Sequence, residues 1–235
     1  INYQYFEKKN SYIVTKTRFI ESYTKNKIFG SYDINDTIID KFDESKFLSL
    51  IKKNIKKSDI VILLDYGHGL ITKKVLSYIT QNSKFLCINK QLNSFNKNKF
   101  KLDLPIKADL FSIQESELRF HFKDQDSNIL KLSKVFFKNN KLKKLVVTLG
   151  SNGSLLIDNR GSLLCPSFNN KKVIDRIGAG DTFFSFACLS NWMKLSNELL
   201  LFIPTVAAGD KISVLGNNYS IKKTKLISLI KNLLK

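Results

Sequence analysis

Residues 175–183 read Asp-Arg-Ile-Gly-Ala-Gly-Asp-Thr-Phe, a pattern that indicates the end of a strand followed by the start of a helix. Glycines let a ligand approach the backbone closely and leave the first N–H groups of the helix exposed. Together with the helix dipole, these groups favour an anion such as a phosphate. Asp181 would repel that anion, so its position suits a base that takes a proton from an attacking hydroxyl. An isolated Gly-x-Gly-Asp is also explained by a simple glycine turn before a helix.

Upstream of this stretch, apolar runs alternate with amphipathic segments. Residues 60–65 (Ile-Val-Ile-Leu-Leu-Asp) are typical of a parallel strand buried on both faces. We expect further strands at 12–20, 27–33, 84–89, 108–113, 144–149, 154–158, 161–165 and 171–174. We expect helices at 43–57, 72–81, 114–122, 127–139, 178–191, 196–214 and 222–234. This order predicts an α/β fold with a mostly parallel sheet, helices on both faces and antiparallel strands added after Gly150. In such folds ligands bind at the carboxyl ends of the strands.

Length and composition limit the class of protein. The chain has 235 residues, of which 43% are hydrophobic and 25% charged, enough for one full α/β domain. No apolar run reaches the roughly 18–20 residues that a membrane-spanning helix needs, so no membrane contact is expected. Cys87, Cys165 and Cys188 show no metal or redox spacing, which predicts reduced, structural thiols and a cytoplasmic location. The chain opens at Ile1 and its one methionine is Met193, so we expect it to be a fragment.

The net charge of +19 has two interpretations. One is a nucleic-acid-binding protein, because such proteins carry clustered basic residues. The other is a basic composition spread over solvated surfaces. Only four of the 39 basic residues are arginines, the residue best suited to bidentate base contacts. The lysines are scattered along the chain, so nucleic acid is the least favoured partner.

The stretch at 175–183 resembles the carboxyl-terminal signature of the ribokinase-like (PfkB) carbohydrate kinases. Four further segments agree with that family in order and spacing, and together they span nearly the whole chain: 65–70, 108–117, 147–153 and 207–217. Within the family, the heptose-phosphate kinases of ADP-heptose synthesis look most similar, together with proteins that fuse a cytidylyltransferase-like domain to a kinase-like domain. The resemblance implies ATP and Mg²⁺ as cofactors, a sugar or sugar phosphate as substrate, and a fused or associated nucleotidyltransferase and a homodimer as candidate partners.

The resemblance also implies roles for individual residues. Asp181 would be the general base, and the amides of Gly178, Ala179 and Gly180 would stabilise the phosphoryl group in flight. Glu117 and Gln114 would hold magnesium, mainly through water. The nucleotide would be lined by Thr148, Gly150, Gly153, Ala208, Gly216 and Asn217. Arg176 stands where the family has a Thr-containing step, and it would either contact a phosphate or pair with an acid.

Four residues are candidates for substrate contact, each with a second interpretation. Lys16 and Arg18 share one face of a strand and would hold a sugar phosphate, or they would simply be exposed on an edge. Asp65 would contact substrate or cap the next turn. His68 stands where the family has lysine, and it would be a catalyst or a local hydrogen-bonding residue.

The family's amino-terminal sugar-binding segment, with its Gly-Gly-x-x-Asn motif, has no counterpart in this sequence. We therefore expect a single ribokinase-like domain at 1–235 that lacks its amino-terminal strands. Residues 1–34 would form lid or edge strands, and 35–235 the nucleotide-binding and catalytic core. The alternative function is a kinase-like module of a fused nucleotidyltransferase that binds nucleotide or sugar phosphate without turnover.

Overall fold

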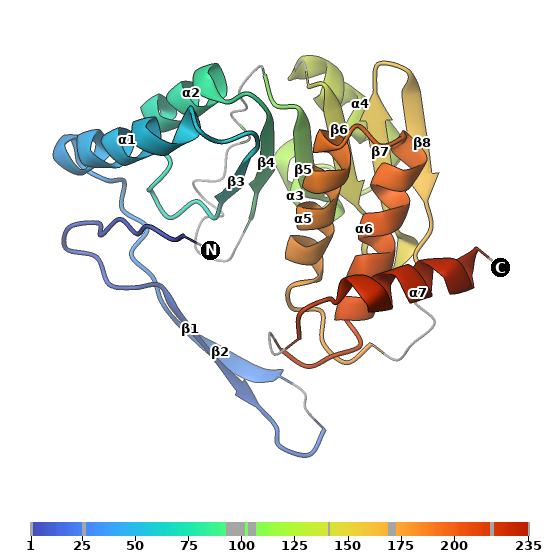
Figure 1. Ribbon diagram of the computed structural model, residues 1–235. Coiled ribbons are helices and arrows are strands. Elements are labelled where there is room, and N and C mark those ends of the chain that lie inside the picture. Colours follow the sequence, from blue (N-terminus) through green and yellow to red (C-terminus); the bar gives the residue numbers. More distant parts are fainter. Residues whose placement is uncertain are drawn as a thin grey trace.

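The structure is a computed structural model, and it describes residues 2–24, 27–92, 102, 107–140, 142–168, 173–216 and 219–234. A sheet lies between two layers of helices, and a two-stranded arm projects from one end (Figure 1). Each layer is built from the alternation of apolar residues along the strands. On β6 (Lys144–Thr148), Leu145 and Val147 belong to one core, whereas Val146 between them belongs to the other. This period of two buries both faces of the strand.

The central sheet has six strands in the order β3-β4-β5-β6-β7-β8. Their bounds are β3 (Val61–Asp65), β4 (Leu86–Lys90), β5 (Leu110–Gln114), β6, β7 (Ser154–Asp158) and β8 (Gly161–Cys165). The strands β3 to β6 are parallel, and β7 and β8 are antiparallel additions. The predicted fold class is therefore confirmed, including the position of the antiparallel strands at one side.

The helices divide between the two faces of the sheet. One face is covered by α1 (Lys41–Ile55), α2 (Lys73–Asn82), α3 (Glu115–Phe122) and α4 (Ile129–Asn139). The other is covered by α5 (Ala179–Trp192) and α6 (Asn197–Lys211), and α7 (Lys223–Leu233) packs on α6. Side-chain caps fix several helix starts. The Thr72 hydroxyl, for example, accepts a hydrogen bond from Val75 N at 3.2 Å, as expected for a helix that opens at this threonine.

The arm is an antiparallel pair of β1 (Thr15–Ile20) and β2 (Lys27–Asp33). It stands apart from the central sheet (Figure 1). Phe19 stacks on Phe29 with ring centroids 4.1 Å apart, and both rings remain partly exposed. Most of the arm's contacts are therefore internal to the ribbon.

One predicted strand is wrong. Val173 and Ile174 belong to no strand, and 171–172 lie outside the described residues. The backbone N–H groups of Ile174 and Asp175 both donate to the carbonyl of Ile212, at 2.9 and 3.1 Å. These bonds connect Ile174 and Asp175 to the end of α6. A strand would instead bond to a series of carbonyls along a neighbouring strand, whereas here both N–H groups share one carbonyl. The helix predicted at 196–214 ends at Lys211 for the same reason, since Ile212 begins this junction.

Within the described ranges, no helix is long and apolar enough to cross a membrane. Cys87, Cys165 and Cys188 are buried and form no disulfide. Burial raises the pKa of the Cys188 thiol, and the neighbouring Cys87 adds to that effect. The three thiols are therefore parts of the core, as the sequence predicts.

Candidate active site

The carboxyl ends of the parallel strands form one edge that gathers polar residues. Asp65 of β3 lies opposite Lys90 of β4, and Gln114 of β5 lies opposite Thr148 of β6. Helix α5 follows Gly178, whose positive φ of 77° lets the chain turn into the helix. Asp181 lies in the first turn of this helix.

Tyr66 links the end of β3 to the start of α5. Its side chain forms a hydrogen bond with Asp181. Burial, followed by the negative charge of Asp181, raises the pKa of the Tyr66 phenol. The Lys16 ammonium group lies 5.4 Å from the centre of the Tyr66 ring. The arm, the end of β3 and the start of α5 therefore meet at Tyr66, with Lys16 near its ring and Asp181 bonded to its hydroxyl.

The described residues contain nothing that requires a glycine at position 180. Its backbone is not in the positive-φ region, and a Cβ built on it would meet nothing within 4 Å. By contrast, a Cβ on Gly69 would come within 2.0 Å of the Thr37 carbonyl. Open space over the first turn of a helix, where N–H groups are unsatisfied, fits a partner that approaches the backbone closely.

A hollow of about 300 Å³ lies next to Asp181. Ser185 of α5 and Lys211 of α6 line it. Tyr219, in the segment that leads into α7, lines it as well. The hollow is therefore open to a small molecule that reaches the start of α5.

Asp175 holds the two loops beside this hollow together. Its Oδ1 accepts a hydrogen bond from Ile177 N at 3.0 Å, and its Oδ2 accepts one from Gly216 N at 2.9 Å. Gly216 adopts a φ of 62°, and its carbonyl accepts a hydrogen bond from Lys211 Nζ at 2.5 Å. Asp175 thus fixes the approach to α5. Asn217 lies outside the described residues.

The turn after β6 contains two glycines, Gly150 and Gly153, to which the family resemblance gives the same role. A Cβ on Gly150 would meet nothing within 4 Å, whereas one on Gly153 would lie 2.0 Å from the Cys165 carbonyl. Gly153 is therefore required by close packing of two backbone segments. Gly150 and the half-buried Thr148 beside it leave room for a ligand.

Glu117 is a buried helix cap. Its two carboxylate oxygens accept hydrogen bonds from Gln114 N and Leu92 N, both at 2.8 Å. Burial raises the pKa of Glu117, and these two N–H groups act against that rise. The side chain of Gln114 is exposed. No group of three or more His, Cys, Asp or Glu suited to a metal occurs in the part of the chain that the structure describes.

The four substrate candidates lie in different surroundings. Asp65 accepts a hydrogen bond from Gly67 N at 2.9 Å and pairs with Lys90 at 3.5 Å, so it caps the turn. His68 has both ring nitrogens buried without a hydrogen-bond partner among the described residues. Burial and the charge of Lys16 lower its pKa. Lys16 thus lies near both Tyr66 and His68, whereas Arg18 is exposed further along the arm.

The two remaining nucleotide candidates differ in exposure. Arg176 is exposed and its carbonyl accepts from Ala179 N. Among the residues with described positions it makes no ion pair, so the pairing with an acid is not found there. Ala208 is half-buried on α6 and packs at the border of the core.

Comparison with known proteins identifies the family. Residues 16–194 match the pfkB family of carbohydrate kinases, which is well over half of the chain. The chain belongs to the PfkB family of carbohydrate kinases. It is 27% identical over 220 residues to a Mycoplasma genitalium protein named "Putative 1-phosphofructokinase", covering 91% of this chain and 69% of that protein. It is 26% identical over 207 residues to the bifunctional protein HldE of Aliarcobacter butzleri, covering 86% of this chain and only 42% of that protein.

Solved structures show that this PfkB chain has the ribokinase-like fold. The ribokinase of Thermotoga maritima superposes with a TM-score of 0.67 at 19% identity, covering 93% of this chain and 70% of that one. An Arabidopsis thaliana ribokinase complexed with ribose and ATP gives a TM-score of 0.68 at 18% identity, covering 94% and 70%. At these identities the likeness concerns the fold.

Two features of this PfkB-family site were not predicted as functional from the sequence. Tyr66 lies in the segment 65–70, which agrees with the family, but its bond to Asp181 depends on how β3 and α5 meet in space. The hollow lined by Lys211 and Tyr219 joins α6 to the segment before α7. The only sequence signal for Tyr66 is its place directly after a strand that ends in Asp65, at the edge where ligands bind.

Proposed function

We propose that this chain transfers a phosphoryl group from ATP to a hydroxyl of a sugar phosphate. The observation that carries the proposal is the start of α5, where Gly180 leaves open space over free N–H groups beside Asp181. That arrangement suits phosphoryl transfer, a reaction in which the protein itself forms few or no covalent bonds. Positioning and charge stabilisation carry most of such a reaction.

In the proposed mechanism Asp181 takes the proton from the attacking hydroxyl. The N–H groups of Gly180 and Asp181, at the start of α5, stabilise the charge that develops on the transferring phosphoryl group, whereas the Ala179 N–H donates to the Arg176 carbonyl at 3.3 Å. Tyr66 donates a hydrogen bond to the Asp181 carboxylate and so fixes its direction. Tyr66 is a positioning residue in this scheme, because it acts through Asp181.

The proposed nucleotide site extends from α5 into the hollow of about 300 Å³. From the family pattern we keep Thr148, Gly150, Gly153, Ala208, Gly216 and Asn217 as further residues that would line the nucleotide. Arg176 is exposed and so is free to reach a phosphate. The Arabidopsis ribokinase complex with ATP supports ATP as the donor.

The proposed acceptor is a phosphorylated sugar, with heptose phosphate as the specific candidate. Lys16 places a cation beside Tyr66 and His68, where a phosphate on the acceptor would meet it. Arg18 lies further along the same arm, and Asp65 lies at the base of the turn. The names of the relatives, a 1-phosphofructokinase and HldE, support a sugar phosphate.

Magnesium fits this site only through water molecules. The Gln114 side chain accepts from the Glu117 N–H in a capping box, and each Glu117 oxygen accepts one backbone hydrogen bond, so each of these oxygens keeps a lone pair for a water molecule. A magnesium ion held this way would neutralise charge on the phosphates of ATP. The arm as a lid over a core at 35–235, the homodimer and the cytoplasmic location stay predictions.

The first experiment is a thermal-shift assay of this chain with Mg-ATP, with ATP plus a chelator, and with a mixed oligonucleotide. Stabilisation by Mg-ATP alone supports the nucleotide site. Phosphoryl transfer is then measured with fructose phosphates and heptose phosphates as acceptors. Binding without turnover would favour the kinase-like module, and salt-sensitive stabilisation by the oligonucleotide alone would contradict the proposal.

A further inference from the structure

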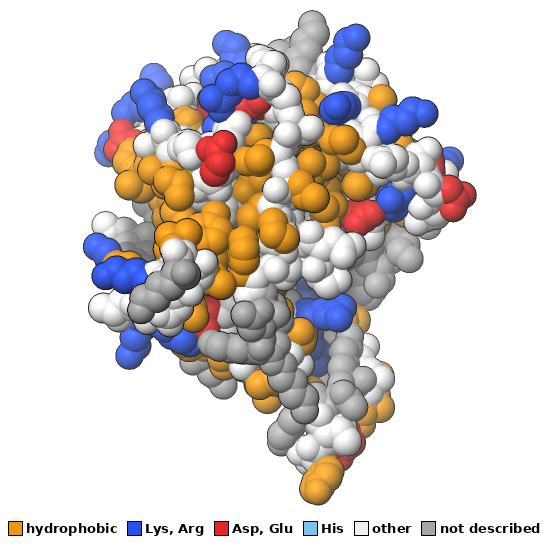
Figure 2. Space-filling model, turned by 90° about the vertical axis from the view of Figure 1, so that its right-hand side faces the viewer, with side chains coloured by type: hydrophobic (Ala, Val, Ile, Leu, Met, Phe, Trp, Pro, Cys, Tyr) orange, Lys and Arg blue, Asp and Glu red, His pale blue; other side chains and the backbone are white. Residues whose placement is uncertain are grey.

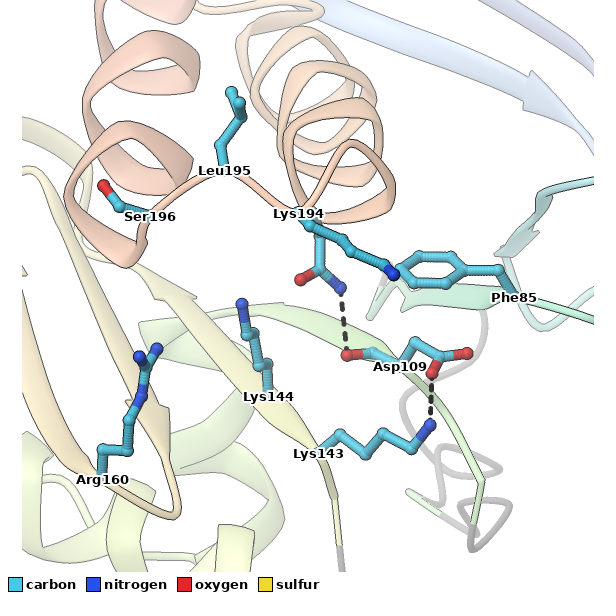
Figure 3. A pocket seen from close by; sticks show the side chains of 9 residues that line it. Phe85, Asp109, Lys143, Lys144, Arg160, Lys194, Leu195 and Ser196 are labelled. Atoms are coloured by element: carbon cyan, nitrogen blue, oxygen red, sulfur yellow. Dashed lines mark hydrogen bonds and ion pairs between the residues drawn. The ribbon is translucent and has the colours of Figure 1, made fainter.

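A second hollow lies at the opposite end of the sheet from Asp181. Its volume is about 410 Å³, the size of a small-molecule site. Residues at the starts of β5 and β6, in the β7–β8 turn and just after α5 line it. Figure 3 shows Lys144 and Arg160 extending from the sheet end toward the connection between α5 and α6.

The charge in this hollow is not balanced. Four cations from three parts of the chain border it. Lys143 pairs with Asp109 at 2.6 Å, and Arg160 pairs with Asp158 at 3.1 Å. The remaining two cations, Lys144 and Lys194, form no ion pair with any residue whose position is described. Glu198 also lies near Arg160, so four positive groups face three carboxylates, which leaves an excess of one positive charge.

Lys144 distinguishes this hollow from an ordinary lysine-rich surface. It is half-buried at the start of β6. Desolvation lowers its pKa, and Arg160 contributes in the same direction, whereas Asp158 opposes them. Asp158 acts on this ammonium group from beyond ion-pair distance, so an anion in the hollow would give Lys144 a direct ionic partner.

The lining also carries apolar surface and free hydrogen-bond donors. The Ser196 oxygen accepts from Leu199 N at 3.4 Å, and its hydroxyl donates to the Glu198 carboxylate, so Ser196 adds no free donor to the hollow. The Arg160 guanidinium uses Nε and Nη2 on Asp158, which leaves Nη1 for another partner. The Phe85 ring provides an apolar wall beside Asp109 and Lys194 (Figure 3). A concave site with this mixture suits a compact molecule better than an extended strand of nucleic acid.

We propose that this hollow binds a small phosphorylated organic molecule, with Lys144, Lys194 and Arg160 on its phosphate and Phe85 against its apolar part. The hollow lies at the amino ends of β5 and β6, whereas Asp181 lies at the other end of α5. A helix of 14 residues spans roughly 21 Å. A ligand in the hollow therefore leaves the start of α5 free, and its binding does not depend on the proposed kinase activity.

The test is calorimetric titration of the chain at low salt with phenyl phosphate and with inorganic phosphate. The double variant Lys144→Met/Lys194→Met should weaken binding of phenyl phosphate by about tenfold or more, because two charge-assisted contacts are lost. The matched control Lys131→Met/Lys134→Met removes the same charge from the exposed face of α4 and should change the affinity less than about twofold. Phenyl phosphate should bind more tightly than inorganic phosphate because of Phe85.

Circular dichroism checks that each variant is folded. If the double variant does not fold, the single variant Lys194→Gln, at an exposed position after α5, replaces it and should still weaken binding severalfold. Equal affinity of the wild type and the lysine variants would overturn the proposal. So would an oligonucleotide that binds through Lys144 and Lys194 while phenyl phosphate does not bind.

Discussion

At the scale of single residues, Asp181 is the group whose removal separates binding from chemistry. Its carboxylate is held by Tyr66 and exposed at the start of α5. Asp181→Asn keeps the shape and the hydrogen bond but cannot take a proton. We expect phosphoryl transfer to fall by about 10²–10⁴-fold while Mg-ATP binding is kept. Steady-state kinetics and ATP titration measure the two effects, and unchanged turnover would remove Asp181 from the mechanism.

Gly180 gives a prediction in which stability and activity move in opposite directions. Alanine at this helical position meets no neighbour and has the higher helix propensity. Gly180→Ala should therefore raise the free energy of unfolding by about 0.5–1 kcal/mol. It should lower kcat for phosphoryl transfer, because the methyl group occupies the space above the N–H groups. Urea denaturation and kinetics report the two quantities.

The control for this change is Ser228→Ala, at an exposed position of α7. It should bring a similar or smaller gain in helix stability and leave activity unaltered. If Gly180→Ala also left activity unaltered, no ligand would approach this turn, and the proposed function would lose its main support.

Glu117 predicts a pH dependence of stability. Its pKa is raised above the usual 4.5 in the folded chain, mainly by burial. The folded state therefore keeps a proton that the unfolded state loses first, and stability falls as pH rises from 4.5 through the folded pKa. Glu117→Gln removes this titration. The wild-type minus variant difference in unfolding free energy should fall between pH 4 and 7, measured by urea denaturation.

The magnesium dependence of turnover tests the same residue in its proposed second role. Glu117→Gln should raise the magnesium concentration needed for half-maximal activity. If that concentration is unchanged, Glu117 acts only as the helix cap described above. In the stability experiment, a wild-type minus Glu117→Gln difference in unfolding free energy that rises with pH would contradict the raised pKa of Glu117.

At the scale of elements, a buried carboxylate holds α7 against α6. The Asp210 side chain is fully buried, accepts from the Tyr219 hydroxyl at 2.6 Å and pairs with Lys225 at 2.9 Å. Lys225→Met removes the cation that pairs with that carboxylate. Because Lys225 is 39% exposed, we expect a loss of about 1–3 kcal/mol, below the cost of breaking a fully buried pair.

Chemical denaturation at pH 7 measures this loss. Lys223→Met is the matched control, because Lys223 is exposed on the same helix. It should change the free energy of unfolding by less than about 0.5 kcal/mol. Equal effects of the two substitutions would show that Lys225 does not stabilise the α6–α7 contact.

The elements that the sequence predicts well are those whose pattern is local. The apolar run at 60–65 correctly predicts the parallel strand β3 (Val61–Asp65), but its burial on both faces is wrong: Ile62 and Leu64 are 41% and 42% exposed, because β3 is an edge strand of the sheet. Val173 and Ile174 are also β-branched, but the backbone N–H of Ile174 donates to the carbonyl of Ile212, which is distant in the sequence, and no strand forms there. Likewise, the motif at 175–183 predicts the start of α5, whereas the bond from Tyr66 to Asp181 depends on tertiary packing. The spacing of residues in a motif thus locates the start of α5 and Asp181, but it does not identify a residue such as Tyr66 that positions Asp181 from another element.

At the scale of the whole molecule, the positive charge is spread out. Figure 2 shows lysines and arginines distributed around the face seen from the β8 side, with hydrophobic side chains between them. Leu164 of the edge strand β8 is 61% exposed. A continuous basic stripe, which binding to a nucleic-acid backbone favours, is absent from the part of this face drawn with described residues. The net charge of +19 therefore produces a general attraction for anions and not a specific binding surface.

The arm and the central sheet should differ in local stability. An isolated pair of strands is marginal in water, and Phe19 and Phe29 are still 43% and 54% exposed. In contrast, Leu145, Val146 and Val147 of β6 are fully buried. Hydrogen exchange should therefore be fast for the amides of β1 and β2 and slow for those of β6, where exchange requires global unfolding. Arm amides as protected as those of β6 would contradict this prediction and would mean that another surface, such as a second copy of the chain, covers the arm in solution.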